Sequence, residues 1–189
     1  DALVTKMAEM GFLGSYLPEE YGGAGLDMLS YAIVVEEVSK ACGSSGVLIS
    51  AHTSLCSGPI YTFGTEEQKK KWLPALNSGE KIGCFLLTEP DAGSDAGGTA
   101  TTYTRDGDHF VINGSKTFIT NGGYLGTGVL LASYDRSLKH KGITAFIVEG
   151  KSPGIIAGKK EKKMGIRASH TGEVFFQDVR VPAANRIGD

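Results

Sequence analysis

The sequence has few cysteines, only a slight net charge and no long hydrophobic run. Its three cysteines, Cys42, Cys56 and Cys84, lie in apolar or small-residue surroundings without CxxC spacing. We therefore expect buried free thiols in a reducing compartment, and we predict no metal site. A net charge of -2 over 189 residues argues against a nucleic-acid-binding protein. No apolar run approaches the roughly 20 residues that cross a membrane, and no basic and apolar leader is present. We expect a soluble intracellular protein without a membrane span.

The chain divides into a helical half and a strand half. With 189 residues, of which 41% are hydrophobic, it can bury the core of one large or two small domains. Helical periodicity dominates up to residue 81, and short strands with glycine-rich turns dominate after it. We predict an α+β protein: an N-terminal all-helical domain over residues 1–81, followed by a small antiparallel β-barrel or sandwich domain over residues 82–189.

The helical half carries start and stop signals. Asp27 is expected to cap the second helix, and Thr65 with Gln68 forms a capping box for the last one. Pro59 is expected to open a separate short helix, and Pro74 to help close the helical part. The predicted helices span residues 2–10, 27–42, 46–57, 59–64 and 65–79.

The helical half also contains polar side chains whose roles can be weighed. His52 fits a satisfied core or helix-surface histidine better than a pocket residue, although it could line a ligand pocket. Glu36 and Glu37 fit solvated or ion-paired carboxylates, because nothing nearby pairs them with an acid or a nucleophile. The expected buried positions are Leu3, Met7 and Met10 in the first helix, and Leu29, Ile33, Val34, Val38 and Ala41 in the second.

The strand half contains several short alternating segments. Asn113–Gly114 is a strong signal for a tight hairpin turn, so the segments on either side of it are expected to be separate strands. The predicted strands span residues 82–87, 101–104, 109–112, 116–120, 129–134, 143–149 and 173–177, with a weaker one near Ile155.

The first of these strands leads into the most informative stretch, Phe85–Asp95. The strand stops at Thr88-Glu89-Pro90, because proline cannot donate to a sheet ladder. The following Ala92–Gly98 segment offers backbone N–H groups with little side chain in front of them. Such a loop suits a phosphate or a flat polar ring, and it could equally be a plain glycine-rich connection. We expect Glu89 to anchor the turn after the strand.

Four motifs carry a family resemblance. Pro18–Gly23, Leu87–Asp95, Asn113–Gly123 and Lys159–Arg167 occur in this order and at this spacing in acyl-CoA dehydrogenases, which the chain resembles over almost its whole length. The lysine-rich fourth motif is most similar to the short-chain, butyryl-CoA branch. The resemblance implies an N-terminal helical domain and a middle β-barrel. The family's C-terminal four-helix bundle would begin about where this chain ends, so we expect the N-terminal and middle domains only, with the start truncated.

The resemblance also implies chemistry. Family members use FAD to convert an acyl-CoA to the trans-2-enoyl-CoA in fatty acid β-oxidation, and pass electrons to electron-transferring flavoprotein. Their glutamate base lies in the C-terminal bundle, so we expect no catalytic residue in this chain, which alone should be inactive. A homotetramer is expected for the full protein, cytoplasmic if bacterial and in the mitochondrial matrix if eukaryotic. The implied cofactor-binding residues are Phe85, Leu87, Thr88, Gly93, Ser94, Phe118, Ile119 and Thr120, and Ser94 is also the implied substrate-binding residue.

Several residues and segments allow more than one role. Phe118 stands where many family members have tryptophan, which keeps an aromatic shield but removes an indole donor. The floor of the acyl pocket is expected among Leu48–Leu55. The basic cluster Lys159–Lys163 could contact CoA phosphates or form a solvated loop. The alternative to a dehydrogenase is a flavin- or CoA-binding module without catalysis, or a non-enzymatic α+β domain that retains the shell.

Overall fold

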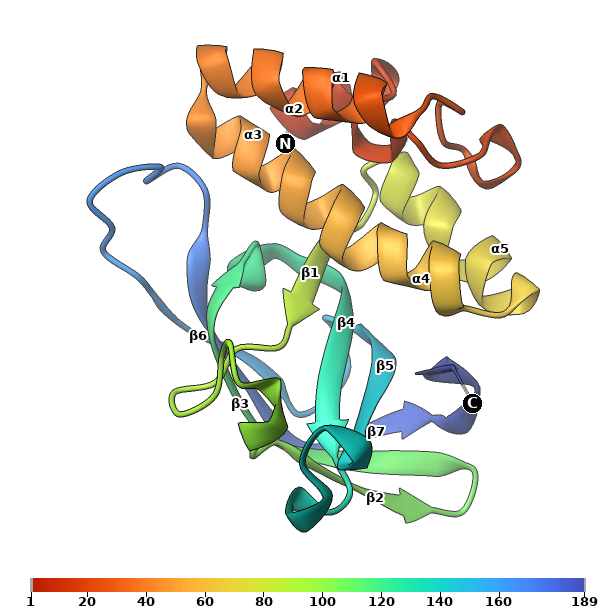
Figure 1. Ribbon diagram of the computed structural model, residues 1–189, viewed down its shortest axis with the longest axis vertical. Coiled ribbons are helices and arrows are strands. Elements are labelled where there is room, and N and C mark those ends of the chain that lie inside the picture. The colour runs from red at the N-terminus through yellow and green to blue at the C-terminus, as the bar shows by residue number, and fades with distance from the viewer. Residues whose placement is uncertain (1, 189) are drawn as a thin grey trace.

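The computed structural model describes residues 2–188 as a group of helices packed over one end of a curved sheet (Figure 1). The helices come first in the chain and the strands follow, as the sequence predicts. Within this range no helix is both long enough and apolar enough to cross a membrane. The α-helices are α1 Ala2–Glu9, α2 Met28–Ala41, α3 Gly43–Ser50, α4 Gly58–Phe63 and α5 Glu66–Asn77.

The predicted helix caps are confirmed. The Ser30 backbone N–H donates to the Asp27 carboxylate at 2.7 Å, and Thr65 and Gln68 make both hydrogen bonds of the capping box. Within α5 the prediction for Pro74 is wrong, because the helix continues through it to Asn77.

The apolar stripes that the periodicity indicates are buried only in part: Met7 is buried and Val38 packs against the helical core. In α2, Leu29 is 68% exposed and Ile33 50%, while the neighbouring stripe that begins at Tyr31 faces the other helices. This helix is apolar on several sides, so helical periodicity alone does not choose between the stripes. Tyr31 decides the choice, because its ring meets that of Tyr16 edge-on at 5.3 Å between centroids. In α1 only Met7 is buried, whereas Leu3 and Met10 are exposed.

Residues 43–63 form one continuous helical run rather than two separate helices. Ala51–Ser57 is a π-helical segment, η3, that joins α3 to α4. Proline at position 59 has no N–H for the preceding turn and its ring crowds the carbonyl four residues back. The wider turn accommodates this, and the Gly58 N–H bonds to the Thr53 carbonyl five residues earlier. The prediction that Pro59 opens a short helix ended by Gly64 is confirmed, since α4 has this proline in its first turn and Gly64 as its C-cap, but this helix continues the preceding run without a break.

The strands form one eight-stranded sheet within the described residues, in the order β6-β7-β3-β2-β4-β5-β8, with β1 beside β4. Most pairs are antiparallel, but β1 runs parallel to β4, and β2 meets β4 in one parallel pair, Thr102 with Ser133. The strands are β1 Ile82–Leu86, β2 Thr102–Asp106, β3 His109–Thr120, β4 Leu125–Ser133, β5 Ile143–Glu149, β6 Ile155–Lys160, β7 Thr171–Pro182 and β8 Arg186–Ile187.

Asn113–Gly114 is not a hairpin turn, because β3 runs straight through it. The Asn113 side chain instead satisfies a bulge on β7: it accepts from the Asp178 N–H at 2.9 Å and donates to the Asp178 carboxylate at 3.0 Å. Asp178 has a φ of 51°, and the register shifts opposite it. Gly114 is required by a close approach, since a Cβ there would lie 2.7 Å from the Thr101 Cα.

The helices dock on the barrel through the start of β1. The Gly83 N–H donates to Nδ1 of His52 at 2.8 Å, and Nε2 of His52 lies 3.1 Å from the Leu76 carbonyl oxygen. The ring is therefore neutral with its proton on Nε2. Cys56 and Cys84 are buried free thiols as predicted, whereas the prediction for Cys42 is wrong because it is exposed. His52 is the satisfied core histidine that the sequence favours.

We predict that His52 makes the fold sensitive to mild acid. Burial lowers its pKa to about 4, so between pH 6.5 and 4 the unfolded chain binds a proton that the folded chain does not. Stability is fully present above pH 6.5 and falls as the pH drops, by about 3 kcal/mol at pH 4. Denaturant unfolding at several pH values measures this. The variant His52→Gln should lose that part of the pH dependence, while the exposed control His140→Gln should keep it.

Candidate cofactor site

The segment after β1 is folded into a tight turn by Glu89. The Glu89 N–H donates to the Ala92 carbonyl at 2.7 Å, and the Ala92 N–H donates to the Glu89 carbonyl at 3.3 Å. The Glu89 carboxylate accepts from the N–H groups of Ala100 at 2.6 Å and Thr101 at 3.0 Å. The expectation that Glu89 anchors this turn is confirmed, and it also holds the start of β2.

The same carboxylate pairs with a buried lysine. Lys116 on β3 has no exposed surface, and its Nζ lies 2.7 Å from Glu89 Oε1 and 3.0 Å from the Leu87 carbonyl oxygen. Burial alone would raise the pKa of Glu89, but the hydrogen bonds from Lys116, Thr101 and Ala100 outweigh it and hold the pKa below its usual value. Burial lowers the pKa of Lys116 in spite of Glu89. No local sequence pattern indicates this pair, because the two residues are 27 positions apart.

A bulge in β3 presents Phe118 to solvent. Lys116 pairs with Val174 and Ile119 with Gly172, so β3 holds one more residue than β7 in this interval. Phe118 takes up the extra length with a φ of 55° and is 62% exposed. A left-handed conformation is costly for a residue with a bulky side chain, and such strain is typical of functional positions.

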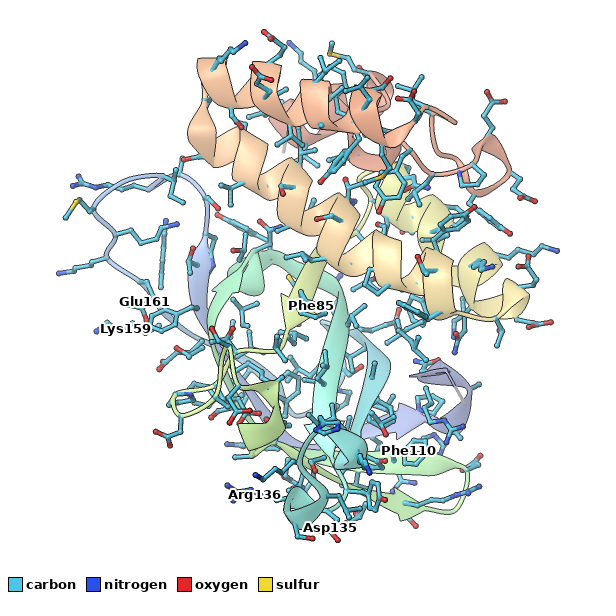
Figure 2. All side chains as sticks on the ribbon, viewed as in Figure 1. Phe85, Phe110, Asp135, Arg136, Lys159 and Glu161 are labelled. Atoms are coloured by element: carbon cyan, nitrogen blue, oxygen red, sulfur yellow. The ribbon has the colours of Figure 1, made fainter. Side chains whose placement is uncertain are left out.

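The predicted site residues gather on the segments around this turn and this bulge. The Thr88 carbonyl accepts from the Thr117 N–H at 2.8 Å, and a Cβ on Gly93 would lie 3.8 Å from the Thr88 methyl. Phe85 lies where β1 passes between the helices and the sheet (Figure 2). Ile119 points into the barrel core, so only its backbone can meet a ligand.

Three predicted ligand groups have no protein partner. Within residues 2–188 the hydroxyls of Thr88, Ser94 and Thr120 make no hydrogen bond to the chain. By contrast, the nearby hydroxyls of Thr99 and Thr101 both bond to backbone carbonyls. Unpaired donors beside an exposed aromatic ring fit the polar edge and the flat face of a flavin.

The small polar loop faces a second segment that the sequence motifs did not include. A hollow of about 400 Å³ lies between Asp95–Gly98 and the turn around Arg136, Ser137 and Lys139. Arg136 lies at the end of the barrel away from the helices (Figure 2). Asp95 also lines the hollow and already accepts from the N–H groups of Gly97 and Gly98, so the groups that suit a phosphate here are the two cations. The sequence carried no signal for this pairing, because it depends on how the barrel folds.

The other predicted ligand regions lie elsewhere. Leu48 lines a separate hollow of about 400 Å³ together with Asn121 and His170, whereas Leu55 is exposed. Lys160 is the last residue of β6, and Lys162 belongs to the projecting loop that follows β6 (Figure 1). Lys163 turns back in that loop and donates to the Ser169 carbonyl at 2.7 Å and to the Thr171 hydroxyl at 2.8 Å. No cluster of side chains suited to a metal ion occurs in the part of the chain that the structure describes.

The fold is that of an α+β protein, and its sheet half carries an exposed aromatic ring and side chains with unpaired hydroxyls. Two family models match the chain: the N-terminal domain of acyl-CoA dehydrogenases over residues 1–80, and the middle domain over residues 84–179. The chain belongs to the acyl-CoA dehydrogenase family.

The relatives point to the short-chain branch. The chain is 55% identical over 185 residues to the short-chain specific acyl-CoA dehydrogenase of Clostridium acetobutylicum, covering 98% of this chain and 49% of that protein. It is 50% identical over 188 residues to the mitochondrial short-chain specific acyl-CoA dehydrogenase of Homo sapiens, covering 100% of this chain and 46% of the relative. The chain thus spans about half the length of the curated relatives it matches.

Three solved structures superpose closely on this chain. Butyryl-CoA dehydrogenase from Megasphaera elsdenii superposes with a TM-score of 0.96 at 47% identity, covering all of this chain and 50% of that one. A chain in the structure of electron transferring flavoprotein of Acidaminococcus fermentans superposes with a TM-score of 0.97 at 50% identity, with the same coverage. The acyl-CoA dehydrogenase of Bacillus anthracis complexed with FAD gives a TM-score of 0.92 at 42% identity, covering all of this chain and 32% of that one.

We predict that relieving the strain at Phe118 stabilises the flavin-free protein. Phe118→Gly should raise the free energy of unfolding by about 1 kcal/mol, because glycine adopts a positive φ without a Cβ clash and the exposed ring contributes little burial. Phe118→Val should lower it, since a β-branched residue is worse in this conformation. Denaturant midpoints of the apoprotein test both changes. A stability loss for the glycine variant would contradict the strain.

Proposed function

We propose that this chain is the N-terminal and middle part of an FAD-dependent short-chain acyl-CoA dehydrogenase, which oxidises a butyryl-CoA-like thioester to the trans-2-enoyl-CoA. The observation that carries the proposal is the unpaired hydroxyls of Thr88, Ser94 and Thr120, of which Thr88 and Thr120 belong to segments that meet at the bulge of the exposed Phe118. The 55% identity to a short-chain specific relative supports the substrate class. FAD supplies the hydride acceptor for such a reaction when it is bound.

Each residue of this site has a task that its exposed groups can perform. The Thr88 hydroxyl would bind the pyrimidine edge of the flavin, and the Thr120 hydroxyl would donate at N5, where a donor stabilises the arriving negative charge. The Phe118 ring would cover one face and exclude water. Leu87 and Ile119 would contribute backbone groups, Phe85 would border the ring, and Gly93 and Ser94 would approach the CoA phosphates and pantetheine.

The three glutamates that the sequence analysis singled out are engaged in other contacts. Glu89 accepts from two backbone N–H groups and from Lys116, and Glu36 and Glu37 both pair with Lys40 on the surface of α2. A base must be free to take a proton from the substrate. We therefore assign no catalytic base to this chain and propose that a glutamate elsewhere in the full protein performs that step.

The remaining assignments follow the relatives. We propose that the full protein acts in fatty acid β-oxidation as a homotetramer and passes its electrons to electron-transferring flavoprotein. The compartment would be the cytoplasm in a bacterium and the mitochondrial matrix in a eukaryote. The match to half of each relative supports one alternative, in which the polypeptide binds flavin or CoA without catalysis.

The test of the proposed function is a substrate titration monitored by the flavin spectrum. The purified full-length protein should carry bound flavin, and its visible absorbance should bleach when butyryl-CoA is added without oxygen. The chain of residues 1–189 alone should give no bleaching, because it lacks a base. Bound flavin that stays oxidised in the full-length protein would support the binding module instead, and a protein without flavin would refute the dehydrogenase and leave only a module that binds CoA.

We further predict that Arg136 and Lys139 bind CoA phosphates. Replacing both by methionine should raise the Kd for butyryl-CoA about tenfold, since two charge-assisted hydrogen bonds are lost. Binding of butyryl N-acetylcysteamine, which has no phosphates, should not change. Isothermal titration measures both ligands.

The matched control replaces Lys160, at the end of β6, and Lys162, in the projecting loop. This variant should bind butyryl-CoA as the unmodified protein does. An effect confined to the Lys160 and Lys162 variant would assign phosphate binding to that loop instead.

A further inference from the structure

The two halves of the candidate site belong to strands that are not paired with each other. Thr88 follows β1, whose ladder partner is β4, while Phe118 and Thr120 lie on β3, which pairs with β2 and β7. No sheet ladder therefore fixes the distance between the Thr88 hydroxyl and the β3 bulge.

Three hydrogen bonds join the Leu87–Glu89 segment to β3 in the described chain, and Asn121, directly after β3, adds a fourth contact by donating to the Gly83 carbonyl of β1 at 3.1 Å. The Thr117 N–H donates to the Thr88 carbonyl at 2.8 Å, and Lys116 Nζ supplies the other two, to the Leu87 carbonyl and to Glu89. Lys116 thus contacts the backbone directly before Thr88 and the side chain directly after it. The next residue along β3 makes the third bond, and Phe118 follows at once.

Packing alone does not require a charge at this position. Lys116 is fully buried, and a methionine of similar length would fill the same space without desolvating an ammonium group. The ammonium group adds directional hydrogen bonds, because it donates to two acceptors on one loop at defined distances. Glu89 extends the link to the start of β2 through the N–H groups of Ala100 and Thr101.

We propose that Lys116, acting through Glu89 and the Leu87 carbonyl, is a positioning residue that holds the Thr88 edge of the flavin site at a fixed separation from the Phe118–Thr120 edge. This inference rests on the proposed function. The link sets the geometry in which donors from both edges meet one ring, and those donors matter most when the ring carries the negative charge of reduction. Lys116 itself touches neither cofactor nor substrate.

The test uses the full-length flavoprotein with Lys116→Met, Glu89→Gln and the double variant. The double variant leaves no unpaired buried charge, so it keeps the experiment informative if a single variant fails to fold. We expect each variant that folds to bind oxidised flavin about tenfold more weakly and reduced flavin about a hundredfold more weakly. That difference lowers the two-electron midpoint potential by about 30 mV.

The direction of the shift separates positioning from simple charge. Lys116→Met removes a positive charge and Glu89→Gln a negative one, so a field effect would move the two potentials in opposite directions, whereas loss of position lowers both. The control Lys81→Met breaks a surface pair with Glu149, at 2.6 Å, and should leave flavin affinity and potential unchanged.

Two results would overturn the positioning role alone: potentials that shift in opposite directions, or unchanged affinity and potential in variants with a lowered melting temperature. An unmodified full-length protein that binds no flavin would refute the proposed function, and this inference with it.

Discussion

The buried ion pair between Lys116 and Glu89 is the contact on which the geometry of the sheet domain's candidate site depends. It joins the end of β1 to the start of β2 and the middle of β3; β2 and β3 pair with each other in the sheet, whereas the ladder partner of β1 is β4. Removing one partner of such a pair costs about 3–5 kcal/mol, because the other charge stays buried without compensation. The pair is therefore a strong constraint on the native arrangement, even though an apolar pair could match its net stability.

A second constraint fixes that arrangement against the helices. β1 carries the site residues at one end and meets η3 at the other, where a Cβ on Gly83 would lie 2.7 Å from the Cys56 Cβ. Only glycine permits this approach, and His52 satisfies the Gly83 N–H that no strand reaches. A further contact joins α5 to the C-terminal part of the sheet, where the Gln68 side chain donates to the carbonyls of Ala184 and Arg186. Helices and sheet therefore share a core, and a change in helix docking would move β1 and the site with it.

The parts of the fold that the sequence predicted are those set by neighbours along the chain. Asp27 and the Thr65–Gln68 box depend on residues three positions away, and both were identified correctly. The hairpin turn predicted at Asn113–Gly114 was wrong, because the same dipeptide occurs in turns and beside bulges, and the partner of Asn113, Asp178, is 65 residues away. Arg136 and the Lys116–Glu89 pair were missed for the same reason. The family resemblance named Thr88 and Phe118, but no local pattern shows why these two residues come together.

Three of the positions that violate local preferences lie near the candidate site. Among residues 2–188, five residues other than glycine have positive φ: Phe118 forms the β3 bulge, Asn121 follows β3 directly, Lys139 lines the hollow beside Gly97 and Gly98, and Ile166 and Asp178 lie elsewhere. Each conformation costs of order 1–3 kcal/mol, which the rest of the fold must offset. The strained conformation at Phe118 leaves its apolar ring exposed, so burial of the ring does not offset the strain. A ligand that covers the ring does explain it, because the strain then places an aromatic wall before the ligand arrives and reduces the ordering needed on binding.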